Sequence, residues 1–249
     1  MHKPDSAVAV KIFPSPNHGE RKTPLDAIIL HYTGMDSSAA ALKWLCNPLS
    51  EVSCHYFIRE NGKVVQLVPE ARRAWHAGRS FWSGETDMNS RSIGIEIVNP
   101  GHAGGCTPFA PAQIAATIAL CRDIAARHKI APQRILAHSD IAPGRKQDPG
   151  EMFPWDVLHK AGVGHWTPAE KISGGRFLSP GESGEPVQAL QAMLAMHGYG
   201  VAITGSYDAA TKAVVEAFQR HFRPAKVDGV ADASTIKTLR NLLASLPRA

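Results

Sequence analysis

Two histidines and one aspartate stand where a protein could hold a metal ion. His31 closes the apolar run 27–30 and His138 closes the apolar run 135–137, so each is expected at the end of a buried strand, where side chains reach a cleft. Asp148 follows ten residues after His138, across a segment whose Pro143 and Gly144 prevent a single helix and let the chain fold back. Two imidazoles and one carboxylate suit a tetrahedral Zn²⁺ site with its fourth position left for water. Because paired histidines at strand ends are also common as plain hydrogen-bonding groups, the spacing alone leaves both interpretations open.

A hydrolytic zinc site would also need a base for its water and a cation for the developing oxyanion. Glu96 is a candidate for the base, because alternation along 93–98 places the isoleucines on one face and Glu96 on the other. A carboxylate in an apolar strand is unfavourable unless it is paired or functional, and an ion pair across the sheet is the structural alternative. Lys146 precedes Asp148 by two residues and could direct its ammonium at the same water. Taken alone, it would be interpreted as a solvated loop lysine.

The elements around these residues indicate an α/β fold, a mixed β-sheet flanked by helices. Short apolar runs rich in β-branched residues predict strands at 27–32, 55–58, 64–68, 92–98 and 134–138. A helix is expected over 111–129, with Pro111 near its start and apolar residues at helical spacing, and a second helix over 37–45. Residues 1–172 are therefore interpreted as the domain that carries the candidate site.

The composition changes near residue 160, where a stretch rich in glycine, proline and serine runs from His159 to Glu185. Such a stretch is typical of a linker, which we place at 173–184. Helical patterns at 186–197, 208–221 and 232–245 then predict a small three-helix domain over 185–249, near the lower size limit for autonomous folding. We expect this bundle to fold apart from the first domain.

A set of motifs runs in one order through residues 25–158. The longest begins at His138 and reads His-Ser-Asp-Ile-Ala-Pro-Gly-Arg-Lys-Gln-Asp-Pro-Gly. The others are Ile29-Leu-His31-Tyr-Thr, Ser53-Cys-His55-Tyr, Leu67-Val-Pro-Glu, Ala74-Trp-His76-Ala-Gly78 and Asn89 through Ser92-Ile-Gly-Ile-Glu96. Together they resemble the zinc-dependent N-acetylmuramoyl-L-alanine amidases of the type 2 amidase family, which also takes in phage lysozyme-like amidases and, more distantly, animal peptidoglycan-recognition proteins.

The resemblance implies that His31, His138 and Asp148 are the zinc ligands, that Glu96 is the catalytic acid/base and that Lys146 stabilises the oxyanion. The implied reaction is hydrolysis of the amide between the lactyl group of N-acetylmuramic acid, including its anhydro form, and L-alanine of the stem peptide. Zinc-bound water would attack, and Glu96 would take its proton and return it to the leaving amine.

Two further histidines fall in these motifs without being ligands. His55 lies in a predicted strand, and we expect an internal hydrogen bond for it. His76 lies in a Trp-His-Ala-Gly loop and could face the substrate, so it is a candidate substrate-binding residue.

The C-terminal segment resembles the three-helix peptidoglycan-binding domain found on many wall hydrolases. The similar stretches are Val187-Gln-Ala-Leu190, Thr204-Gly-Ser-Tyr-Asp208, Thr211-Lys-Ala-Val214, Phe218-Gln219 and Val227-Asp-Gly229. The alternative is a generic helical cap that stabilises the first domain. Because the candidate catalytic residues precede residue 150, we expect a chain ending near Lys171 to keep zinc and cleave small muropeptides, while losing attachment to insoluble wall.

Two rival functions remain at the level of the sequence. A recognition protein could hold peptidoglycan or a muropeptide without cutting it, but such relatives typically lose a zinc ligand and this sequence keeps the full set. The net charge of +5 would suit a polyanion. The basic residues are scattered rather than gathered in a stripe interleaved with aromatics, so no nucleic-acid partner is expected.

The sequence gives mixed indications about location. No run approaches the roughly 18 apolar residues of a membrane helix, so no transmembrane segment is expected. Residues 1–24 also lack the continuous apolar core of a signal peptide. The His-Tyr-Thr triplet and the wall-binding tail resemble the envelope branch of the family, which favours the cell envelope or periplasm, with the cytoplasm as the alternative. The oligomeric state and the pairing of the cysteines are left open.

Overall fold

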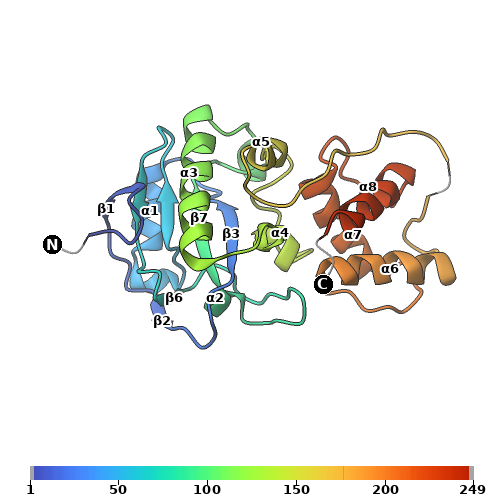
Figure 1. Ribbon diagram of the computed structural model, residues 1–249, viewed down its shortest axis with the longest axis horizontal. Helices are drawn as coiled ribbons and strands as arrows, with labels where there is room; N and C mark the ends of the chain where they lie inside the picture. Colours follow the sequence, from blue (N-terminus) through green and yellow to red (C-terminus); the bar gives the residue numbers. More distant parts are fainter. Residues whose placement is uncertain (1–2, 176, 247–249) are drawn as a thin grey trace.

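A six-stranded sheet forms the centre of the computed structural model, which describes residues 3–175 and 177–246 (Figure 1). The strand order is β1-β5-β4-β7-β3-β8. The strands are β1 (Ala9–Ile12), β3 (Ala27–Tyr32), β4 (Tyr56–Ile58), β5 (Val64–Gln66), β7 (Ser92–Ile97) and β8 (Ile135–Ala137). All neighbours are parallel except β4 and β5. The expected mixed sheet is confirmed, with β1 as an edge strand that the sequence analysis did not predict.

The neighbouring strands β3 and β7 bury different side chains on their two faces. On β3, Ile28 and Leu30 belong to the core under helix α3, whereas Ile29 belongs to a second core on the opposite face. β7 places its isoleucines in the core under α3. Because side chains alternate along a strand, His31 and Glu96 share the face opposite α3.

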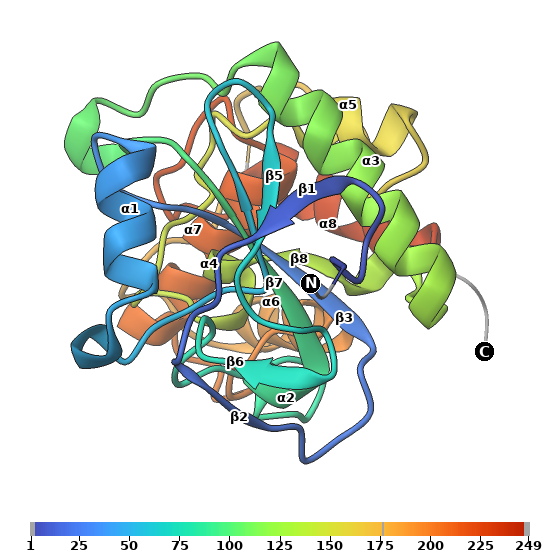
Figure 2. The same ribbon diagram turned by 90° about the vertical axis from the view of Figure 1, so that its left-hand side faces the viewer.

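Helices cover both faces of the sheet. Helix α3 (Pro111–His128) and the short α5 (Trp155–Lys160) lie on one face. Helix α1 (Ser38–Leu45) covers part of the other, where Ala41, Leu42 and Leu45 share a core with Phe57 of β4. Figure 2 shows α1 and α3 on opposite sides of the strands. Both helices expected in the first domain are therefore confirmed.

Several small elements complete the first domain. They are the two-stranded antiparallel ribbon of β2 (His18–Glu20) and β6 (Arg72–Ala74), the one-turn helices α2 (Met88–Arg91) and α4 (His138–Ile141), and short 3₁₀ turns at Pro48–Ser50, His102–Gly104 and Pro132–Arg134. His138, expected as the last residue of a strand, is instead the first residue of α4. Periodicity cannot reveal elements of three or four residues, because they span about one repeat.

The C-terminal segment folds into the expected bundle of three helices, α6 (Glu185–His197), α7 (Ala209–Phe222) and α8 (Ala233–Ala244). Asp208 and Asp232 cap α7 and α8. Their carboxylates accept hydrogen bonds from the backbone N–H groups of Thr211 and Thr235, each at 2.8 Å. Such caps satisfy donors that a helix start leaves unpaired.

The bundle packs directly on the first domain, although the sequence analysis expects it to fold apart. A single hydrophobic core contains Trp82 and Ile141 of the first domain together with Leu190, Tyr199 and Phe218 of the bundle. Figure 1 shows α4 between the sheet and the bundle, next to α7. The sequence pattern could not reveal this core, because a helix face that packs on another domain has the same periodicity as one that packs within the bundle.

The glycine-rich stretch before α6 is bound to the bundle rather than free. The backbone of Leu178 exchanges two hydrogen bonds with Ala231, at 3.0 and 2.9 Å, and the N–H of Gly184 donates to the carbonyl of Gly205. Further upstream, the Oγ1 of Thr238 accepts a hydrogen bond from the backbone N–H of Glu170. A flexible tether would make none of these contacts.

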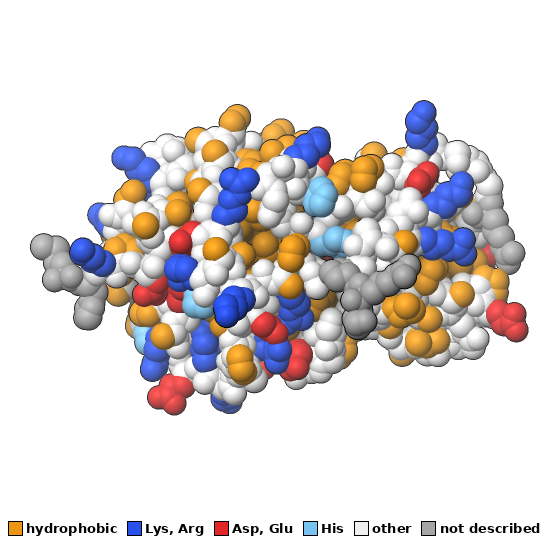
Figure 3. All heavy atoms as spheres, viewed as in Figure 1, with side chains coloured by type: hydrophobic (Ala, Val, Ile, Leu, Met, Phe, Trp, Pro, Cys, Tyr) orange, Lys and Arg blue, Asp and Glu red, His pale blue; other side chains and the backbone are white. Residues whose placement is uncertain are grey.

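The surface shows mixed charge. On the face seen in Figure 3, lysine and arginine side chains are spread over both domains and interspersed with acidic ones. Within residues 3–175 and 177–246, no helix has the length and apolar character needed to cross a bilayer. The four cysteines are free thiols, with Cys54 and Cys121 buried and Cys46 and Cys106 half-buried.

Candidate metal centre and active site

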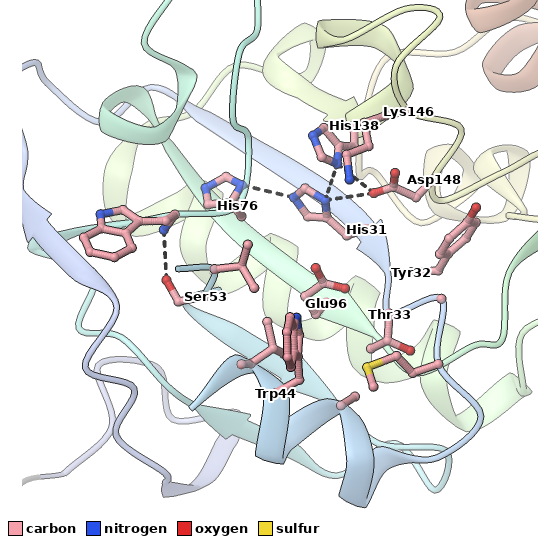
Figure 4. A pocket seen from close by; sticks show the side chains of 16 residues that line it. His31, Tyr32, Thr33, Trp44, Ser53, His76, Glu96, His138, Lys146 and Asp148 are labelled. Carbon is pink, nitrogen blue, oxygen red and sulfur yellow. Dashed lines mark hydrogen bonds and ion pairs between the residues drawn. The ribbon is translucent and has the colours of Figure 1, made fainter. Parts of the chain in front are cut away.

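Three side chains from separate elements meet at one point on the open face of the sheet. His31 comes from the end of β3, His138 from the start of α4 and Asp148 from the loop that follows α4. His31 Nδ1, His138 Nδ1 and Asp148 Oδ2 are each 2.9 Å from the other two, and all three residues are buried. Figure 4 shows the three groups converging. The structure thus brings together the residues that the sequence analysis selected as metal ligands.

Hydrogen bonds on the far side of each ring set its tautomer. His138 Nε2 lies 3.1 Å from the carbonyl oxygen of Ala77, which can only accept, so Nε2 carries the proton. The hydroxyl of Ser92 donates to the Met88 carbonyl, so it accepts from His76 Nε2, 3.3 Å away. His76 Nδ1 is then the acceptor for His31 Nε2 at 3.0 Å. In the neutral form of each ring, these contacts place the Nδ1 lone pair of His31 and of His138 towards the shared point.

This donor set fits a bound cation. Two imidazole nitrogens and a carboxylate oxygen face one another at 2.9 Å, an arrangement that a bound cation stabilises. Burial and the neighbouring His138 lower the pKa of His31 to about 4, so its ring is neutral near pH 7. Two histidine nitrogens and one carboxylate oxygen are typical ligands of Zn²⁺, and ring N–H groups held by other residues are typical of its histidine ligands.

His76 lies behind His31 as an orienting group. Its two ring nitrogens are taken by His31 and Ser92, and its burial, with His31 and other neighbours, lowers its pKa well below the usual value. A Cβ on Gly94 would lie 2.4 Å from the His76 ring, so only glycine leaves room for this ring on β7. Asn89 fixes the loop by accepting hydrogen bonds from the backbone N–H groups of His76 and Ala77, at 2.9 and 2.7 Å.

Glu96 lies beside the three ligands with one oxygen unpaired. It is the register partner of His31 across β3 and β7, and Figure 4 places its carboxyl between His31 and Trp44. Its Oε2 is hidden from solvent and has no hydrogen-bond partner among the described residues. Burial and the charge of Asp148 raise the pKa of Glu96 well above its usual value, while the Lys146 ammonium opposes this shift. Within the part of the chain that the structure describes, no ion pair across the sheet accounts for this carboxyl.

A cavity of about 340 Å³ contains all of these groups. His31, His76, Glu96, His138, Lys146 and Asp148 form its polar side. Its other walls carry aromatic and apolar side chains that the sequence analysis did not select, namely Met35, Trp44, Leu45, Val52 and Trp75. Trp44 is half exposed, at 50%, although it lies on a helix whose other face is packed. An apolar wall opposite a few convergent polar groups is typical of a site for a small molecule.

Two other histidines near the candidate ligands, His55 and His102, have both ring nitrogens in hydrogen bonds. His55 makes the expected internal hydrogen bonds, accepting from the N–H of Gly94 at 2.9 Å and donating to the carbonyl of Arg72 at 3.0 Å. His102, Cys106 and Glu151 also lie close enough to hold an ion. However, the two ring nitrogens of His102 are taken by the Tyr32 hydroxyl and the Glu151 carboxylate, at 2.9 and 3.0 Å. We assign no metal to that group.

Comparison with known proteins matches two families to the two parts of this fold. Residues 21–151 match the N-acetylmuramoyl-L-alanine amidase family, and residues 183–239 match a peptidoglycan binding domain family. N-acetylmuramoyl-L-alanine amidase AmiD of Escherichia coli is 41% identical over 227 residues, which cover 85% of this chain and 79% of AmiD. 1,6-Anhydro-N-acetylmuramyl-L-alanine amidase AmpD of Enterobacter cloacae is 41% identical over 108 residues, covering 43% of this chain and 56% of AmpD.

Solved structures agree with this match over nearly the whole chain. The complex of E. coli AmiD with anhydro-N-acetylmuramic acid-L-Ala-D-gamma-Glu-L-Lys has a TM-score of 0.75 at 39% identity and covers 90% of this chain and 91% of that one. The complex of Pseudomonas aeruginosa AmpDh3 with anhydromuramic pentapeptide has a TM-score of 0.74 at 29% identity and covers 95% and 96%. On these grounds, the chain belongs to the N-acetylmuramoyl-L-alanine amidase family.

Proposed function

We propose that the chain is a zinc amidase that hydrolyses the amide between N-acetylmuramic acid, including its anhydro form, and L-alanine of the stem peptide. One observation carries the zinc requirement: two ring nitrogens and a carboxylate oxygen converge at 2.9 Å beside Glu96, whose buried Oε2 has no hydrogen-bond partner among the described residues. Family membership supports the reaction, and the two solved complexes named above support the substrate class.

His31, His138 and Asp148 would hold the zinc ion. When bound, zinc supplies a Lewis acid that polarises a carbonyl and makes water a nucleophile near neutral pH. The protein's part is to keep the three ligand atoms fixed. It does so with His76 behind His31 and with the Ala77 carbonyl behind His138. We therefore propose His76 as a residue that orients His31, in place of direct substrate binding.

Glu96 is proposed to move the proton in the reaction. Its carboxyl lies in the cavity, next to His31 and within the same wall as Lys146. Glu96 takes a proton from the attacking water and gives it to the nitrogen of L-alanine as the amide bond breaks. A pKa above the usual value suits this double role, because the carboxylate is then a stronger base than an ordinary glutamate and can return the proton as an acid. The Lys146 ammonium stabilises the negative charge on the carbonyl oxygen.

The apolar wall is proposed to position the substrate. Trp44 and Trp75 line the same cavity as the candidate ligands, and aromatic faces of this kind stack on sugar rings and cover peptide backbones. The peptidoglycan binding match of residues 183–239 supports a wall-associated role. We infer a location in the cell envelope, where wall polymer and its anhydro-muropeptide fragments are present.

A cleavage assay tests this function directly. The purified full-length protein is incubated with an anhydro-muropeptide, and the products are identified by mass spectrometry with and without a chelator. Release of the free peptide with L-alanine at its N-terminus, abolished by the chelator and restored by Zn²⁺, is the expected result. Binding of the intact substrate without any cleavage would make the chain a recognition protein instead.

A further inference from the structure

Asp140 joins the two domains directly beside the metal ligands. It lies in α4, two residues after His138, and its side chain is fully buried, with 0% exposure. Its Oδ1 accepts a hydrogen bond from the hydroxyl of Tyr199 at 2.6 Å, and its Oδ2 lies 2.7 Å from His221 Nδ1. Tyr199 follows α6 and His221 lies on α7. Both partners therefore come from the C-terminal bundle.

Both bundle partners are fixed donors. Burial and the Asp140 carboxylate raise the pKa of Tyr199 well above its usual value, so the phenol keeps the proton that it donates. The His221 ring is stacked between Trp155 of α5, with ring centres 3.8 Å apart, and Phe222, with ring centres 3.9 Å apart. A carboxylate oxygen only accepts, so His221 Nδ1 carries the shared proton. Neither donor can turn away without opening the core.

Asp140 passes this restraint to two of the three metal ligands. The same Oδ2 accepts a hydrogen bond from the backbone N–H of Ala137 at 2.8 Å, which closes the turn that starts with His138. Between them, the N–H of Ser139 donates to the backbone carbonyl of Asp148 at 3.0 Å. The backbone of α4 thus sets the positions of both His138 and Asp148.

We propose that Tyr199 and His221 are positioning residues of the metal centre, so that the C-terminal bundle forms part of the active-site support in addition to any role at the wall. This inference rests on the proposed zinc site. Wall attachment does not account for Tyr199 and His221, because both are buried and neither can contact the wall. Loss of either donor leaves the buried Asp140 carboxylate short of a partner. The backbone of α4 then relaxes, and His138 and Asp148, whose positions it sets, move with it.

The test compares two tyrosines of the bundle in the zinc-loaded, full-length protein. Tyr199→Phe removes the hydroxyl that reaches Asp140. Tyr207→Phe is the matched control, because Tyr207 is equally buried, at 1%, and its hydroxyl donates within the bundle to the carbonyl of Gly229. The rate of zinc transfer to a coloured chelator is measured, together with kcat and KM on a soluble anhydro-muropeptide.

Tyr199→Phe should lose zinc about tenfold faster than the wild type, at the lower end of the effect of altering groups behind metal ligands. Its kcat should fall while KM stays close to the wild-type value, because the substrate wall is untouched. Tyr207→Phe should leave the zinc transfer rate and kcat unchanged. His221→Phe keeps the stacked ring and removes the donor, so it should behave like Tyr199→Phe. If Tyr199→Phe does not fold, the zinc transfer rate of His221→Phe tests the positioning role instead.

Two results separate this inference from the function on which it rests. If the wild type holds zinc, and Tyr199→Phe and His221→Phe release it as slowly as Tyr207→Phe, the positioning role is wrong while the zinc amidase stands. If the wild type holds no zinc, the proposed metal site fails first, and the positioning role fails with it.

Discussion

His31 and Glu96 are direct register partners on the neighbouring parallel strands β3 and β7. A candidate metal ligand and the candidate proton carrier are thus held by one hydrogen-bonded ladder, on the face that the isoleucines of β7 do not occupy. Side chains opposite each other on adjacent strands lie about 5 Å apart at Cβ. The sheet therefore sets their separation without help from any loop, whereas Asp148 and Lys146 depend on the chain that follows α4.

Removal of a histidine ligand should remove the metal. We expect about one zinc per chain in the purified wild type, and His138→Ala should lose it, because two ligands rarely hold zinc without a third. Elemental analysis of the desalted protein measures this directly. Unchanged zinc content in both His31→Ala and His138→Ala would exclude the site.

Glu96→Gln should keep the fold and the zinc while losing most of the activity. The amide has the shape of the carboxyl and cannot take up a proton, and general acid/base catalysis is typically worth about 10²–10⁴-fold in rate. Zinc content and melting temperature should match the wild type, since Oε2 of Glu96 has no partner to lose among the described residues. Near-normal turnover in the zinc-loaded variant would mean that another group moves the proton.

Gly94→Ala should weaken zinc binding although residue 94 is no ligand. The new Cβ would lie 2.4 Å from the His76 ring, so His76 must move and His31 loses the partner that fixes its tautomer. Zinc affinity should fall by about 10–100-fold, the usual range for groups behind a metal ligand. Gly174→Ala is the matched control, because no atom lies within 4 Å of a Cβ at that position. Equal zinc affinity in the two variants would show that His76 does not support the site.

The pKa of Glu70 makes a separate prediction about stability. This carboxylate is buried, and hydrogen bonds from Arg127 (2.6 and 2.7 Å), Tyr56 (2.5 Å) and His128 (2.6 Å) outweigh burial and lower its pKa to about 2. A depressed pKa stabilises the fold fully above the unfolded value of about 4.3, and this contribution is lost as the pH falls towards 2.

Glu70→Gln should therefore be less stable than the wild type by about 2 kcal/mol at pH 7, a figure that allows for solvent screening of Arg127. The difference should shrink as the pH falls from 4.5 towards 2. Urea unfolding at several pH values measures it. Asp123→Asn, which alters a more exposed partner of the same Arg127, should change the stability by about 0.5 kcal/mol. A gap between Glu70→Gln and wild type that stays constant with pH would contradict the assignment.

The sequence was sufficient for strands β3 and β7 and for the positions of His31 and Glu96 on them. The apolar run before His31 and the alternation around Glu96 are local patterns that a buried strand imposes on its own residues. Residues that act through long-range contacts leave no such pattern. Tyr199 and His221 meet Asp140 across 59 and 81 residues, and in the sequence each is only a polar position in a small helical domain.

The cavity wall was missed for a related reason. Trp44 lies on the amphipathic helix α1 and is exposed, which is unusual for a tryptophan. The sequence does not show that it is exposed, because it does not show which face of the helix is packed. His76 was found as a motif residue, but its role depends on the Ser92 hydroxyl and on the missing side chain of Gly94. Neither contact follows from residue spacing.

The last prediction reverses the expectation that a chain ending near Lys171 keeps zinc and the cleavage of small muropeptides while losing only wall attachment. A chain ending at Lys171 would lose the bundle side of the shared core and expose Trp82 and Ile141, now 2% and 1% exposed. It would also leave Asp140 without its two bundle donors. We expect this truncated protein to aggregate or to melt well below the full-length protein.

Any soluble fraction of the truncated protein should release zinc faster and show a lower kcat even on a small anhydro-muropeptide, which has no need of wall attachment. Size-exclusion chromatography measures aggregation, thermal unfolding the melting temperature and chelator competition the release of zinc, while a cleavage assay gives kcat. The wall-binding role is tested apart from them by co-sedimentation of the full-length Tyr199→Phe protein with purified sacculi, which should equal that of the wild type. A monomeric truncated protein with full zinc retention and the kcat of the full-length enzyme would instead show that the two domains work as independent modules, despite their common core.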